Sequence, residues 1–130
     1  MRINCRLIVV ALVAAGLACG GGTTEPLAAC SGAVTVTVTG GTTPTIGWTP
    51  ECGADFLMVA EPLPPSVGFA EEPRWVIGAD ARLIEPSVRY GRTPNGVQEL
   101  LVAHQLEVGR TYRASVRNGP TFLGAATFTP

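Results

Sequence analysis

Three kinds of side chain in this sequence could support catalysis, but none is arranged for it. His104 is the only histidine and therefore the only imidazole base for a nucleophile, and no serine lies in a Gly-x-Ser-x-Gly turn. The carboxylates Glu71 and Glu72 are adjacent in a proline-bounded stretch, where we expect them to be solvated rather than opposed across a substrate. No phosphate-binding loop or dinucleotide fingerprint occurs. We therefore expect no enzyme activity and no cofactor.

A second group of side chains indicates binding rather than catalysis. Arg89 and Arg92 flank Tyr90, and Trp75 follows a proline-rich stretch. Exposed aromatic rings beside arginine are typical of binding hot spots, so these four residues are the candidate ligand-binding set, for a protein or a glycan. The alternative is structural: the arginines would cover a polar outer face, and Trp75 would fill the core.

The charge of the chain argues against a nucleic-acid partner. The sequence has nine basic residues, all arginine, and ten acidic residues. Arg2 and Arg6 lie in the N-terminal segment, so the chain after residue 19 carries seven arginines against ten acidic residues, a net charge of −3. Binding of nucleic acid requires clustered positive charge to neutralise phosphates, and no basic run is present.

The first 18 residues have the composition of an export signal. Arg2 and Arg6 precede an apolar run of 12 residues, 7–18. As a helix this run would rise about 18 Å, which is too short for a hydrocarbon core of roughly 30 Å. Its length and its positive flank are typical of a secretory signal. We therefore expect residues 1–18 to be a signal helix that is not part of the folded domain.

The end of this run, Gly16-Leu17-Ala18-Cys19, resembles the lipobox of bacterial lipoproteins, with Gly16 where a leucine is usual. In that family the cysteine sulfur receives a diacylglycerol, and cleavage leaves the cysteine as the first residue. The resemblance implies lipidation of Cys19, membrane lipid as a partner and, from the glycine at position 20, the outer membrane. The alternative is ordinary cleavage after Ala18, which gives a soluble periplasmic or secreted protein. Residues 19–29 would form a flexible tether, because they are rich in glycine and threonine.

Two cysteines remain for the exported domain. Cys5 leaves with the signal and Cys19 takes the lipid, so Cys30 and Cys52 are the pair left over. In an exported domain such a pair predicts one disulfide. Alternation over 33–39, a turn cluster and a second strand predict a hairpin that brings the two cysteines opposite each other. A redox site would need a closer pair, and two sulfurs with one histidine rarely suffice for a metal, so we expect no metal site.

The segment 30–130 has the pattern of about seven short strands in one domain. Apolar or alternating runs are separated by turn signals; they lie at 33–39, 45–49, 55–60, 74–77, 82–90, 111–117 and 121–129. Four prolines predict a long loop over 61–73. The stretch 97–106 is ambiguous between a short helix and extended chain, and its glycine and proline flanks favour extended chain. The pattern predicts an all-β fold, an antiparallel β-sandwich.

The stretch 106–116 resembles the penultimate strand of fibronectin type III domains, with Leu106, a turn containing glycine, Tyr112 six residues after the leucine, and then alternation. Residues 44–50, which include Trp48, are similar to the second strand of that family, and 127–130 to its last. The resemblance covers about residues 33–130. It implies an immunoglobulin/fibronectin type III-like sandwich in which Tyr112 forms a tyrosine corner, with its hydroxyl bonded to the chain upstream. The disulfide and the 61–73 loop depart from the usual pattern of the family.

These observations predict a lipoprotein of the cell envelope that carries a small β-sandwich. Function is not fixed by fold, so two classes stay open. The first is a binding module for a protein or glycan partner. The second is a passive structural or accessory subunit of an envelope complex, with no ligand of its own.

Overall fold

The computed structural model describes residues 25–68 and 70–130. The predicted signal over 1–18, the predicted lipidation site Cys19 and the first part of the tether lie outside the described residues. Within the described ranges, no helix has the length and apolar character needed to cross a membrane.

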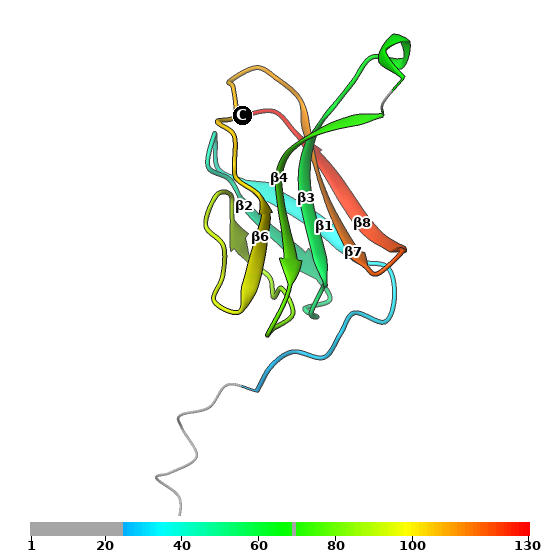
Figure 1. Cartoon of the computed structure of the whole chain (residues 1–130), viewed down its shortest axis with the longest axis vertical. Helices are drawn as coiled ribbons and strands as arrows, with labels where there is room; N and C mark the ends of the chain where they lie inside the picture. The colour runs from blue at the N-terminus through cyan, green and yellow to red at the C-terminus, as the bar shows by residue number, and fades with distance from the viewer. Residues whose placement is uncertain (1–24, 69) are drawn as a thin grey trace, which may run out of the picture.

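The described residues fold into two antiparallel sheets (Figure 1). One sheet has the order β1-β2-β5 and the other the order β6-β4-β3-β7-β8. The strands are β1 (Thr35–Thr39), β2 (Thr45–Thr49), β3 (Phe56–Pro62), β4 (Glu71–Ala79), β5 (Val88–Arg89), β6 (Val97–Leu101), β7 (Tyr112–Asn118) and β8 (Thr121–Phe128), and one short 3-10 helix, η1, spans Pro65–Val67. The prediction of an all-β sandwich is confirmed, with eight strands rather than about seven, and 97–101 is a strand.

The core lies between the two sheets and follows from the alternation of the strands. In β1 and β2, Val36, Ile46 and Trp48 point inward, and the threonines of the two strands lie on the outer side. From the other sheet, Leu57 and Val116 are each fully buried. These rows meet face to face, as expected for two sheets that each bury one side.

The predicted disulfide between Cys30 and Cys52 is confirmed, with the Cα atoms 4.8 Å apart. The hairpin register pairs Thr35 with Thr49. Before β1 the chain turns, so that Ala29 forms a parallel bridge with Gly53. The two cysteines are therefore held beside each other by backbone pairing on the N-terminal side of the hairpin, as well as by the sulfur bond.

The prediction of a loop over 61–73 is wrong at both ends. Strand β3 continues to Pro62 and β4 begins at Glu71, so the loop is 63–70, closed by a 3.2 Å hydrogen bond from the Leu63 N–H to the Ala70 carbonyl. Pro73 is tolerated in β4 for two reasons. The β3–β4 register shifts there, and β6 pairs only with residues 76–79, so no partner strand needs the missing N–H.

One side of the sandwich is closed by contact between the two sheets. The Val34 N–H donates to the Leu123 carbonyl over 3.0 Å, which joins the start of β1 to β8. Gly124 makes this approach possible, because a Cβ atom at that position would overlap the carbonyl oxygen of Val34. The edges formed by β5 and β6 therefore lie on the opposite side.

Candidate functional site

The four residues predicted to bind a ligand do not form one surface site. Trp75 is fully buried and Tyr90 is 6% exposed. The Trp75 Nε1–H donates to Glu99 Oε2 over 3.0 Å, and its ring meets the ring of Tyr90 edge to face, with centroids 5.3 Å apart. The expectation of exposed aromatic rings here is wrong, because each ring fills the core and its polar atom is bonded within the domain.

Arg89 and Arg92, in contrast, are exposed. Arg89 donates to the hydroxyl of Thr43 at 3.4 Å, a long contact on the surface. Within the described ranges, no ion pair is made by either arginine. Because the rings of Trp75 and Tyr90 are buried, Arg89 and Arg92 are solvated cations on the surface with no aromatic ring beside them from this pair.

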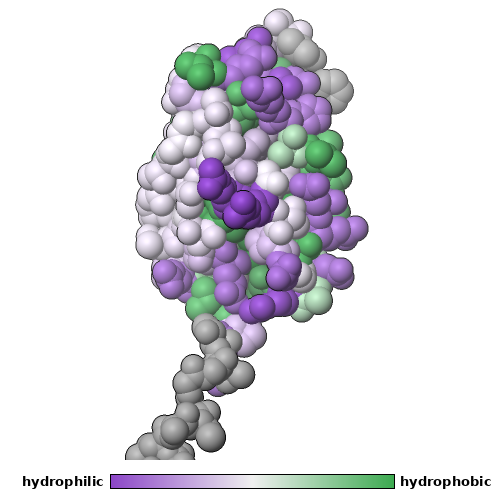
Figure 2. All heavy atoms as spheres, turned by 90° about the vertical axis from the view of Figure 1, so that its left-hand side faces the viewer, coloured by the Kyte–Doolittle hydropathy of each residue, from purple (hydrophilic) through white to green (hydrophobic). Residues whose placement is uncertain are grey.

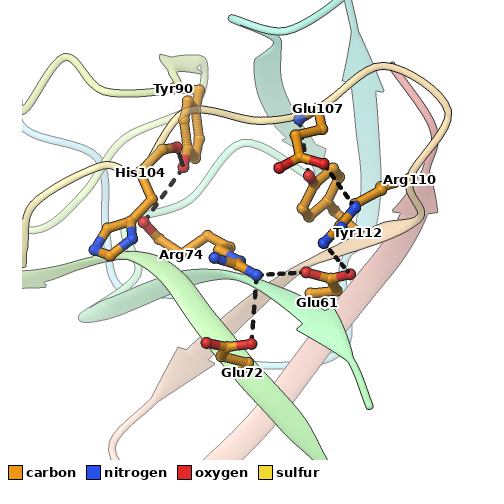
Figure 3. A network of polar contacts seen from close by, with 8 residues as sticks. All are labelled: Glu61, Glu72, Arg74, Tyr90, His104, Glu107, Arg110 and Tyr112. Carbon is orange, nitrogen blue, oxygen red and sulfur yellow. Dashed lines mark hydrogen bonds and ion pairs between the residues drawn. The ribbon is translucent and has the colours of Figure 1, made fainter. Parts of the chain in front are cut away.

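The Tyr90 hydroxyl ties the segment after β6 to β4. It donates to the carbonyl of His104 at 2.5 Å, and the carbonyl of Arg74 lies 3.3 Å away (Figure 3). The His104 N–H donates to the same Arg74 carbonyl. Burial raises the pKa of Tyr90 to about 12, because the phenolate would lose its hydration.

This pKa predicts a loss of stability at alkaline pH. Because the folded-state pKa lies above the ordinary value of 10.0, the stabilisation is complete below pH 10 and disappears as the pH rises to about 12. We expect the free energy of unfolding to fall by on the order of 2 kcal/mol over this interval. Urea unfolding at pH 9 to 12 measures it. Tyr90→Phe should flatten the profile, and an equally steep profile in that variant would contradict the assignment.

Tyr112 is the other buried tyrosine, 1% exposed, at the start of β7. Its hydroxyl accepts a 2.8 Å hydrogen bond from the N–H of Glu107, five residues upstream (Figure 3). A buried phenol needs such a partner. The bond joins the turn before β7 to the strand itself.

Tyr112→Phe should destabilise the domain by about 1–3 kcal/mol, because the Glu107 N–H loses its acceptor while the ring stays in place. Thermal or urea unfolding of both proteins measures the change. Thr111→Ala is a suitable control, since that residue is exposed and we expect less than about 0.5 kcal/mol. Equal stabilities for Tyr112→Phe and the parent would mean that the hydroxyl contributes nothing.

A charged network braces the β3–β4 hairpin. Arg74 contacts Glu61 at 2.6 Å and Glu72 at 3.3 Å, and Arg110 contacts Glu61 at 3.3 Å (Figure 3). The hydrogen bond to Glu61 is the main cause that raises the pKa of Arg74. The four charges of the network therefore pair with one another, and we assign it a structural role.

A third arginine extends this brace to β7. Arg113 contacts Glu71 at 2.9 Å, and its guanidinium lies 5.5 Å from the centroid of the Phe122 ring. The hairpin that the network supports projects past the sandwich at the upper end of Figure 1.

The outer face of the five-stranded sheet is apolar in its middle, which is unusual for a face over which residues 25–68 and 70–130 place no further layer. Strands β3 and β4 contain the uninterrupted runs 56–60 and 75–79 rather than alternating sequence. Leu57 points into the core, whereas Met58 and Val76 pair with each other on the opposite face. Strands that read as continuous apolar runs are typical of sheets that are covered on both faces.

A groove of about 680 Å³ lies on this outer face. Gly78 leaves a hollow in its floor, and the side chain of Leu100 leans over it: a Cβ atom on Gly78 would lie 3.1 Å from Leu100 Cδ1. The groove is lined by Asp55, Phe56, Met58, Gly78, Ala79, Gln98, Leu100, Arg117 and Gly119. The groove can hold apolar side chains, and its polar groups are the guanidinium of Arg117, the carboxylate of Asp55 and the amide of Gln98.

None of the groove residues was among the candidate binding residues from sequence. The signal that could have found them is the lack of alternation over 56–60 and 75–79. Figure 2 looks onto the side of the molecule that carries β6 and shows small hydrophobic groups set among hydrophilic residues.

In the part of the chain that the structure describes, no three His, Cys, Asp or Glu residues lie together as metal ligands. No family model, curated protein or solved structure matches this chain.

Proposed function

We propose that this chain is a lipoprotein of the bacterial cell envelope, anchored through Cys19, whose immunoglobulin/fibronectin type III-like sandwich binds a protein partner. The observation that carries the binding role is the groove on the outer face of the five-stranded sheet, between strands that are apolar on both faces. Apolar surface of this kind is stabilised when a partner covers it.

A protein partner is favoured over a glycan by the placement of the aromatic residues. Both tryptophans are buried, Trp48 at 2% exposure and Trp75 at 0%, so neither offers a flat indole surface to a sugar ring. The groove instead contains Met58 and Leu100, whose flexible side chains adapt to another protein surface.

The fibronectin type III-like assignment is supported by the bond from the Glu107 N–H to the Tyr112 hydroxyl, the contact that a tyrosine corner requires. The anchor is supported by Gly16-Leu17-Ala18-Cys19 and the glycine-rich residues that follow. Glycine at position 20 favours the outer membrane.

The anchor is tested by mass spectrometry of the full chain expressed in a bacterium with lipoprotein export. We expect an N-terminal peptide that begins at acylated Cys19. A Cys19→Ser variant should keep its signal or appear as soluble protein. An unacylated wild-type chain that begins at residue 19 would overturn the anchor and leave a soluble exported protein.

The binding role is tested by a photo-crosslinking residue placed at Met58 in intact cells. The matched control position is Thr37, which is exposed on the outer side of the other sheet. We expect crosslinks to one defined protein from Met58 and none from Thr37, and a Leu100→Glu substitution should remove them. Absence of crosslinks from Met58 would favour the alternative, a passive accessory subunit.

A further inference from the structure

The sheet edges differ in how they are protected. Strand β8 is covered where the Val34 N–H bonds to Leu123, and β5 is only two residues long. Strand β6 is five residues long and pairs with β4 on one side, and no strand of the described chain pairs with its other side. Half of the backbone polar groups of a strand point to each neighbour. On the free side of β6 the Val97 N–H donates to the Pro94 carbonyl, and the groups that follow it along the strand are available for pairing.

Strand β6 lacks lysine and proline, two residues that commonly protect an exposed edge; its sequence is VQELL. Its one charged residue, Glu99, uses the same carboxylate oxygen to accept from Trp75 Nε1 and from the Thr93 hydroxyl at 3.1 Å. Its carboxylate is therefore bonded to two residues of the same domain. Two apolar residues are exposed instead, Leu100 at 53% and Val102, just after the strand, at 68%.

A bulge connects this edge to the groove. Leu101 pairs with Val76 and Glu99 with Ile77, so Leu100 is the extra residue of β6. Bulges redirect a side chain, and that of Leu100 lies over Gly78 in the groove. The edge strand thus forms one wall of the groove.

We propose that the partner binds as an extended strand along the free edge of β6, as a sixth strand of this sheet, with alternate apolar side chains entering the groove beside Leu100. This inference rests on the proposed protein-binding function. In such strand addition, main-chain hydrogen bonds supply affinity and side-chain pockets supply specificity. The partner segment is therefore extended, rich in β-branched or aromatic residues, and alternates apolar with polar residues.

The probe is a phage-displayed library of random dodecapeptides, selected on the full-length acylated protein in detergent micelles. We expect the enriched peptides to alternate apolar and polar residues. A selected peptide, once synthesised, should slow amide hydrogen exchange in residues 97–101 by about tenfold or more. Enriched peptides that protect another segment, or a selection that enriches none, would overturn the proposal.

Substitutions distinguish peptide binding along the edge of β6 from nonspecific hydrophobic binding. Leu100→Lys and Val102→Lys should each weaken peptide binding by about tenfold, because lysine is a natural edge-protecting residue. Val108→Lys is the matched control: Val108 is 79% exposed and lies outside β6, so its variant should bind as the parent does. Equal weakening by all three would contradict the proposal.

The crosslinking and exchange experiments together distinguish this inference from the proposed function. Crosslinks at Met58 without protection of β6 would reject strand addition but keep the groove as the binding site. Loss of both would reject the binding function itself.

Discussion

Trp75→Ala is expected to destabilise the domain by about 3–5 kcal/mol, the range for removing a large buried aromatic side chain. The Trp75 ring is fully buried and packs against Tyr90. Its removal leaves a cavity between the sheets and takes from Glu99 the indole N–H that it accepts. Urea unfolding monitored by circular dichroism measures the loss directly.

Trp75→Phe is the informative companion variant. It keeps most of the ring volume and loses the hydrogen bond to Glu99, so we expect a smaller loss than for alanine. A loss below about 1 kcal/mol for Trp75→Ala would contradict the buried position. A binding defect in any Trp75 variant must therefore be compared with its stability, whereas Met58 and Leu100 test binding from the surface.

Loss of the disulfide is the second large effect. Cys52→Ser should lower the free energy of unfolding by roughly 3 kcal/mol, because Cys30 and Cys52 close a loop with a sequence separation of 22 residues. The β signal in circular dichroism should persist at low temperature. The melting temperature in the oxidised state measures the change.

The control for this prediction is chemical. A thiol reductant should lower the melting temperature of the parent protein and leave that of the double variant Cys30→Ser/Cys52→Ser unchanged. A parent protein that melts at the same temperature with and without reductant would show that the bridge adds no stability.

Local pattern predicted much of this fold. The alternation in 33–39 and 111–117 correctly predicted strands β1 and β7, because residues on one face of a strand recur at every second position. The pairing of Cys30 with Cys52 followed from the turn cluster between two strands. The strand ends around 61–73 were wrong because proline is permitted where a strand has a bulge or an open edge, and a single sequence reveals neither.

The burial of Tyr90 and Trp75 shows a different limit of prediction from sequence. Trp75 begins the apolar run 75–79, so period-2 alternation could not assign its ring to the inner face. The contact of Arg110 with Glu61 joins residues separated by 49 positions, and it exists only once the hairpin stem lies beside the turn before β7. The groove likewise needs the register that brings Leu100 over Gly78.

The N-terminal attachment has a mechanical consequence. Ahead of β1 the Leu27 N–H donates to Glu85 Oε1 and the Ala28 carbonyl accepts from the Gly53 N–H, and the chain then passes through Cys30. If the chain is held at a membrane, tension along it reaches the Cys30–Cys52 covalent bond before it reaches the hydrogen bonds of β1. A load would then be shared between β1 and β2, and it would not separate β1 from its neighbours one hydrogen bond at a time. The oxidised domain should therefore resist pulling from its N-terminal end better than the reduced domain does.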